Sequence, residues 1–84
     1  MTIFAIIAPV ANVELRRSVQ EHFPRNIEFA PGQFVISVQG VTSQQVALQI
    51  GVDGSKGKFV VFSVAAHWGY HDKTLWEWMT VNAS

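Results

Sequence analysis

The chain has 84 residues, which suits a single domain over residues 1–84, and 49% of them are hydrophobic while only 14% are charged. Ordinary domains carry about 25% charged residues, so part of this apolar surface is expected in an interface with another molecule. A formal net charge of +0 disfavours a strong nucleic-acid binder, and the absence of cysteine excludes disulfides and thiolate metal sites.

The first predicted element is a strand from Thr2 to Ala8, which contains the uninterrupted apolar run Ile3–Ile7. Such a run is typical of a strand that is covered on both faces, and Pro9 ends it because proline has no amide donor. The run is too short to span a membrane and has no basic flank before it. We therefore expect a cytoplasmic protein that does not enter a membrane.

A helix and a hairpin are predicted next. The helix begins after Asn12, whose side chain suits the N-cap, and ends before Pro24, because the residue before a proline is steered out of the helical region. Its apolar stripe consists of Leu15, Val19 and Phe23. Residues 26–39 predict a β-hairpin, because Pro31 and Gly32 suit the central positions of a type II turn between two alternating segments.

A second helix, predicted over Ser43–Ile50, has the strongest local pattern in the chain. Thr42 and Gln45 fit a capping box, in which each side chain satisfies a backbone donor of the other residue. Gly51 suits the C-terminal cap. The glycine-rich loop that follows lacks the spacing of a phosphate-binding loop and leads into a strand, so we expect a flexible turn there.

The last two predicted elements are a strand and a helix. The strand covers Lys58–Ala66 and is apolar on both faces except at Ser63, and the helix begins near Asp72 or Thr74. Its apolar face spans an arc of about 160°. That face consists of Leu75, Trp76, Trp78 and Met79. A short helix with so broad an apolar face must dock on another surface.

The order strand, helix, strand, strand, helix, strand, helix predicts an α+β fold of the ferredoxin-like type, a βαββαβ sandwich with one additional C-terminal helix. Its four-stranded antiparallel sheet has the spatial order 4-1-3-2, with both crossover helices on one face. The opposite face should be dry over the first and fourth strands, which are apolar on both sides, and wetter towards the second. The wetter part is indicated by one side of the third strand, formed by Gln33, Val35, Ser37 and Gln39.

The dry half of the open face needs a cover. The final helix is one candidate for this cover, and a second copy of the chain is the other. The fourth strand would also be an apolar sheet edge, which invites pairing with another chain. We therefore predict a homodimer built around the fourth strand and the final helix.

One cluster of functional side chains precedes the final helix. His67 and His71, with His22 as a possible third member, are candidate metal ligands or an acid–base pair. Their spacing suits a metal only within a helix, and Gly69 disfavours a helix there. The alternative is an aromatic-rich turn with exposed histidines. No cofactor is expected.

Two further sets of residues are candidates for ligand binding. The aromatic set, a platform for stacking bases or a flat ligand, consists of Trp68, Tyr70, Trp76 and Trp78. Its alternative role is in the core or in an interface. The basic set, a small positive patch beside the first helix, consists of Arg16, Arg17 and Arg25. Its alternative role is a solvated helix face.

The layout resembles that of the small ferredoxin-like proteins that include the CRISPR-associated nuclease two and the SinR-like domains. The shared features are an apolar first strand, a helix, a Phe-Val-Ile strand, a short capped helix, an apolar fourth strand and a tail with tryptophan. Those nucleases have an aspartate at the end of the first strand, where this chain has Ile7-Ala8-Pro9. The resemblance therefore implies the fold and not the metal-dependent nuclease activity. The segment Thr74–Met79 is also similar to the tail of small uncharacterised bacterial proteins, which implies no known activity.

These observations favour a non-enzymatic interaction module that self-associates and binds a protein partner, because charge is low, apolar surface is in excess and no catalytic set is evident. One alternative is a nucleic-acid-binding domain related to the CRISPR-associated ferredoxin-like proteins, which would use the basic and aromatic sets. The other is a metal-dependent hydrolase centred on His67 and His71.

Overall fold

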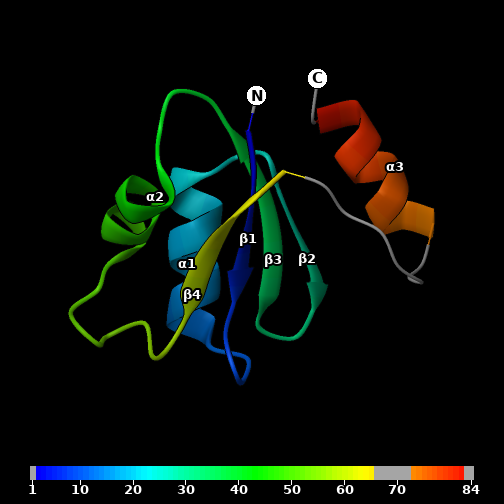
Figure 1. Ribbon diagram of the computed structural model, residues 1–84. Helices are drawn as coiled ribbons and strands as arrows, with labels where there is room; N and C mark the ends of the chain where they lie inside the picture. Colours follow the sequence, from blue (N-terminus) through cyan, green and yellow to red (C-terminus); the bar gives the residue numbers. More distant parts are fainter. Residues whose placement is uncertain (1, 66–72, 83–84) are drawn as a thin grey trace.

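The computed structural model describes residues 2–65 and 73–82, and Figure 1 shows how their strands and helices are arranged. In chain order the elements are β1 (Thr2–Ile7), α1 (Val13–His22), β2 (Asn26–Ala30), β3 (Gln33–Val38), α2 (Ser43–Ile50), β4 (Val60–Val64) and α3 (Lys73–Asn82). This order of elements is the one predicted. No helix in the described part of the chain is long and apolar enough to span a bilayer.

The four strands form one antiparallel sheet, as the α+β prediction requires. Their order is β2-β3-β1-β4, which is the 4-1-3-2 order counted from the other edge. β1 lies inside the sheet, between β3 and β4, and its apolar run contributes to both faces, with Phe4 and Ile6 in one core and Ile3 in the other. β4 begins later than the predicted strand, because β1 pairs only as far as Ile7, which is opposite Val60.

Helices α1 and α2 cover one face of the sheet and enclose the main core (Figure 1). The buried residues of this core are Phe4, Ile6, Ala8, Leu15, Val19, Phe23, Phe34, Ile36, Val46 and Ile50. Both helices begin with the predicted caps. The Asn12 side chain accepts a hydrogen bond from the Leu15 amide, and Thr42 with Gln45 forms the capping box. These contacts satisfy backbone donors that a helix leaves without partners in its first turn.

Helix α3 packs on the opposite face of the sheet, on the side of β2 (Figure 1). A second, smaller core lies beneath it. Its buried residues are Ile3, Val35, Leu75 and Met79, with Ile27, Phe29, Val64 and Trp78 packed around them. At the end of α3, the Ser37 hydroxyl donates a hydrogen bond to the Asn82 carbonyl oxygen over 2.6 Å.

This docking of α3 corrects the predicted distribution of water on the open face. Val35 and Ser37 of β3, expected on the wetter half, are only 4% and 5% exposed. The exposed strand is instead β4, where Val60 and Phe62 are 54% and 55% exposed. The prediction was wrong because α3 covers the β2 and β3 side of the face. The hydroxyl of Ser37 donates its hydrogen bond to the Asn82 carbonyl oxygen at the end of α3, so a polar side chain at this position did not indicate a wet face.

Candidate interaction surface

The predicted histidine cluster and half of the predicted aromatic set lie outside the described residues. These residues are His67, Trp68, Tyr70 and His71. His22 is exposed at the end of α1, and its Nδ1 atom lies 2.9 Å from the Ser18 carbonyl oxygen. A carbonyl only accepts, so this contact places a proton on Nδ1. Within residues 2–65 and 73–82, no three His, Cys, Asp or Glu side chains are grouped as metal ligands would be.

Arg16 of the predicted basic set is engaged within the fold. It donates from Nε to Glu28 Oε1 over 2.6 Å and from Nη2 to Glu28 Oε2 over 3.2 Å. Glu28 Oε2 also accepts a hydrogen bond from the Gly32 amide, so one carboxylate ties α1 to the hairpin turn. The hydrogen bond from Arg16 lowers the pKa of Glu28 below its ordinary value, and the same bond raises the pKa of Arg16.

The other two residues of the basic set, Arg17 and Arg25, are exposed. Arg17 lies 3.9 Å from the carboxylate of Glu14 in the first turn of the same helix. Carboxylates next to Arg16 and Arg17 reduce the positive potential that a phosphate backbone requires. These pairings favour the solvated helix face over a phosphate-binding patch. Sequence reasoning missed the partner of Arg16 because Glu28 is 12 positions away and on another element.

The described part of the aromatic set belongs to the docking of α3. Trp78 is half-buried and packs against the smaller core. Trp76 also belongs to α3, but its side chain is outside the described part of the molecule. For Trp78 this position corresponds to the core or interface role and not to an open stacking platform.

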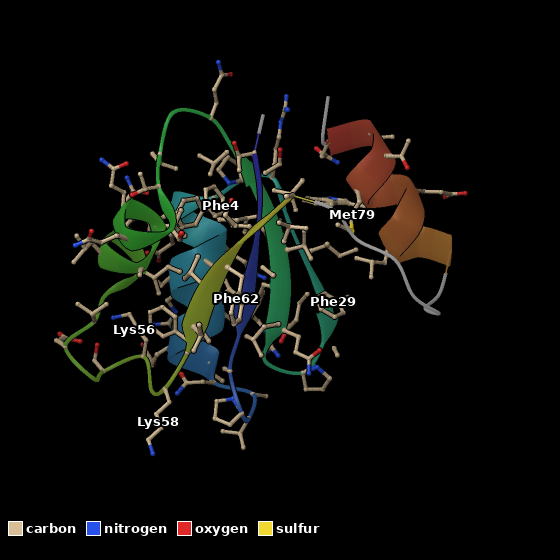
Figure 2. All side chains as sticks on the ribbon, in the orientation of Figure 1. Phe4, Phe29, Lys56, Lys58, Phe62 and Met79 are labelled. Atoms are coloured by element: carbon tan, nitrogen blue, oxygen red, sulfur yellow. The ribbon has the colours of Figure 1, made fainter. Side chains whose placement is uncertain are left out.

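An exposed apolar surface lies on β4, on the part of the open face that α3 leaves uncovered. It consists of Val60 and Phe62 of β4 with their cross-strand neighbours Ile7 and Ala5 of β1, and we call it the β4 patch. Ile7 and Ala5 are half-buried. Figure 2 shows Phe62 on β4, well separated from Met79 of α3. The sequence signal for this surface is the uncharged fourth strand, which predicts an apolar sheet edge that invites pairing with another chain.

β4 is also an edge of the sheet, because β1 is its sole strand neighbour within the described residues. Its sequence, Val-Val-Phe-Ser-Val, has no charged residue and no proline. It therefore lacks the features that protect edge strands of soluble proteins against pairing. β2, the other edge, has such features: Glu28 within the strand, a register shift between Glu28 and Ala30, and Pro31 directly after the strand. Among the residues that the structure describes, β2 carries protecting features and β4 has no strand on its outer side.

A cavity of about 300 Å³ between α2, the following loop and β4 is a second candidate location. It is lined by Ala47, Val52, Gly54, Gly57, Lys58, Phe59 and Val61. The loop is held by Asp53, whose carboxylate accepts hydrogen bonds from the amide and the hydroxyl of Ser55. The hydrogen bond from the Ser55 backbone amide makes the largest contribution to lowering the pKa of Asp53. Apart from Lys58 the described lining is uncharged, and we assign no reaction to it.

Comparisons of the chain with protein-family models, with curated proteins and with solved structures gave no match. The functional proposals therefore rest on the residues and their geometry.

Proposed function

We propose that the chain is a non-enzymatic interaction module that self-associates through β4 and binds a protein partner. The observation that carries this proposal is the unprotected edge of β4 beside the exposed side chains of Val60 and Phe62. A free strand edge offers a row of backbone donors and acceptors to another strand. An apolar surface beside that edge adds the free energy of hydrophobic burial.

Further large apolar side chains, exposed away from β4, support a protein partner in addition to a second copy. They are Val10, Val13, Leu48, Val52 and Val81. Single exposed hydrophobic residues are normal on any protein. In a chain with only 14% charged residues, however, a dimer through β4 leaves apolar surface available to another protein.

The architecture that we propose is a ferredoxin-like sandwich, with α3 as an addition on the face opposite the two crossover helices. The element order and the strand order support it. In this arrangement α3 occupies the β2 side of the open face and restricts the interaction surface to the β4 side.

The strength of self-association follows from β4 itself. Full burial of a Val or Phe side chain contributes about 1.5–3 kcal/mol. Val60 and Phe62 are each about half exposed, so two copies together gain at most about 5 kcal/mol, and less where the paired sheet leaves part of these open-face side chains in water. Backbone hydrogen bonds between edge strands add about 1 kcal/mol each, whereas association costs at least about 4 kcal/mol. The balance predicts a dissociation constant in the micromolar to millimolar range.

Sedimentation equilibrium over a series from about ten micromolar to about one millimolar tests the proposal. The mass of the wild-type chain is expected to rise from one chain to two. Phe62→Ser removes the central apolar side chain and should move this transition to about tenfold higher concentration or more. Val81→Ser is the control, because Val81 is also exposed, at 74%, but lies on α3, which contacts β2.

Two results would contradict the proposal. One is a wild-type chain that stays monomeric throughout the concentration series. The other is a Phe62→Ser variant that dimerises like the wild type while its circular dichroism spectrum is unchanged.

The two alternative functions have less support from the described residues. Phosphate binding by Arg16 requires a free guanidinium, whereas the Glu28 carboxylate holds it with two hydrogen bonds. The hydrolase depends on His67 and His71, which the structure does not describe, and it stays a prediction.

A further inference from the structure

We propose that two copies of the chain pair β4 with β4 in antiparallel orientation, about a two-fold axis through Phe62, and join two four-stranded sheets into one. This inference rests on the proposed self-association and adds its geometry. A second copy is the occupant of the edge because β4 is complementary to itself.

The self-complementarity is visible in the residue pairs that such an axis creates. Phe62 lies opposite Phe62 of the second copy, Val60 opposite Val64, and Val61 opposite Ser63. In an isologous interface each of these pairs occurs on both sides of the axis. None of the paired residues is charged, so no like charges meet, and aromatic and β-branched pairs are the ones that stabilise antiparallel strands.

Other symmetric registers pair β4 less completely. An axis through Val61 places Val64 opposite Lys58 of the second copy, so a charged residue from outside the strand enters the interface. An axis through Ser63 places the first two residues of β4 opposite positions beyond the end of the strand. An axis through Phe62, the middle residue of β4, pairs every residue of the strand with another residue of the strand.

The symmetry also fixes which faces come together. Two identical antiparallel edge strands are related by an axis perpendicular to the sheet, so both helix layers lie on one side and both open faces on the other. The two β4 patches then form one continuous apolar surface centred on Phe62 of each copy. α3 packs mainly on the β2 side of the sheet (Figure 1) and reaches β4 only at Val64, which lies against the smaller core, while Val60 and Phe62 stay exposed.

The helix layer contributes to the same interface. α2 is the helix that contacts β4, so the pairing brings the two α2 helices towards each other across the axis. Each α2 carries Leu48, one of the exposed large apolar residues of the domain.

Cysteine cross-linking tests this geometry, because the chain contains no cysteine of its own. Directly opposite residues of antiparallel strands have Cβ atoms about 4.5–5.5 Å apart, which a disulfide spans with a small adjustment. Because loss of the Phe62 side chain weakens association, Phe62→Cys is tested at about tenfold the concentration at which the wild-type chain dimerises, where it is expected to cross-link to near completion under oxidation. Val81→Cys, on the exposed side of α3, is the control and should stay at background.

A second experiment keeps Phe62 in place. Val60→Cys and Val64→Cys chains are each expected to remain largely uncross-linked when oxidised alone and to cross-link when they are mixed. If sedimentation shows a dimer but neither Phe62→Cys nor the mixture cross-links, the register is wrong while self-association stands. Cross-linking of Val60→Cys alone would also overturn the register. If the chain is a monomer throughout, both proposals fail.

Discussion

The docking of α3 decides how much of the open sheet face remains available, and Met79 is the residue that tests it. Met79 is 4% exposed in the smaller core, whereas Val81, in the same helix, is 74% exposed. Truncation of a buried Met to Ala costs about 2–5 kcal/mol, while a change at an exposed site stays within about 0.5 kcal/mol. We expect Met79→Ala to lose about 2 kcal/mol, near the lower limit, because Ile27 and Phe29 at the rim of this core are only partly buried.

Amide hydrogen exchange followed by NMR measures this loss in α3 itself, because it reports the opening of individual elements. A loss of about 2 kcal/mol corresponds to roughly 30-fold faster exchange. We expect this acceleration for the amides of α3 in Met79→Ala, with the amides of α1 in the main core unchanged. Val81→Ala, the matched control, should leave both helices unchanged. Equal exchange of α3 in the two variants would refute the idea that the smaller core holds this helix.

Two further predictions concern the turn between β2 and β3. Because Arg16 lowers the pKa of Glu28, the ionised carboxylate contributes stability above its unfolded pKa of about 4.3, and this is lost as the pH falls through the lower folded pKa. In urea unfolding, Glu28→Gln should therefore lose up to about 1 kcal/mol at neutral pH and show no deficit near about pH 2; a deficit that persists in acid contradicts this. Gly32→Ala would place a Cβ atom 2.8 Å from the Val10 carbonyl oxygen at φ +77°, whereas Gly40→Ala at φ +79° meets nothing within 4 Å. Both variants should lose about 1 kcal/mol in free energy of unfolding for the left-handed backbone. Gly32→Ala should lose about 1–3 kcal/mol more, because its Cβ atom collides with the backbone. Equal losses in the two variants would contradict the collision.

The elements of this fold were predictable from the sequence where a pattern is completed within a few residues. The N-cap at Asn12 and the capping box of Thr42 and Gln45 each join residues three positions apart. The apolar run of β1 indicated a strand covered on both faces, and β1 contributes Phe4 and Ile6 to the main core and Ile3 to the smaller core on the other face. The four-stranded antiparallel sheet with its helices followed from the alternation of strand and helix patterns along the chain.

The apolar fourth strand indicated an edge that invites pairing, but the extent of the exposed surface was not predictable, because it depends on contacts between distant elements. Ser37 indicated a wet face, but its hydroxyl bonds to the Asn82 carbonyl oxygen, 45 positions along the chain. Arg16 indicated a positive patch, but its charge is paired with Glu28 on β2. A side chain's character predicts the kind of environment it prefers. It does not predict which surface an amphipathic helix such as α3 packs on. Because α3 packs on the β2 side of the sheet, Val60 and Phe62 of β4 remain exposed.

The difference between the two sheet edges determines whether self-association ends at two chains. Head-to-tail pairing of β4 with β2 of the next copy would repeat without limit and produce a fibre. β2 opposes this, because its register shift between Glu28 and Ala30 interrupts the regular ladder and Pro31 follows the strand. In the proposed dimer the two β4 strands pair with each other, so both outer strands of the joined sheet are β2. An uncharged strand edge favours aggregation, above all in a chain with only 14% charged residues. A closed dimer avoids this, because it leaves no β4 edge available to a further chain.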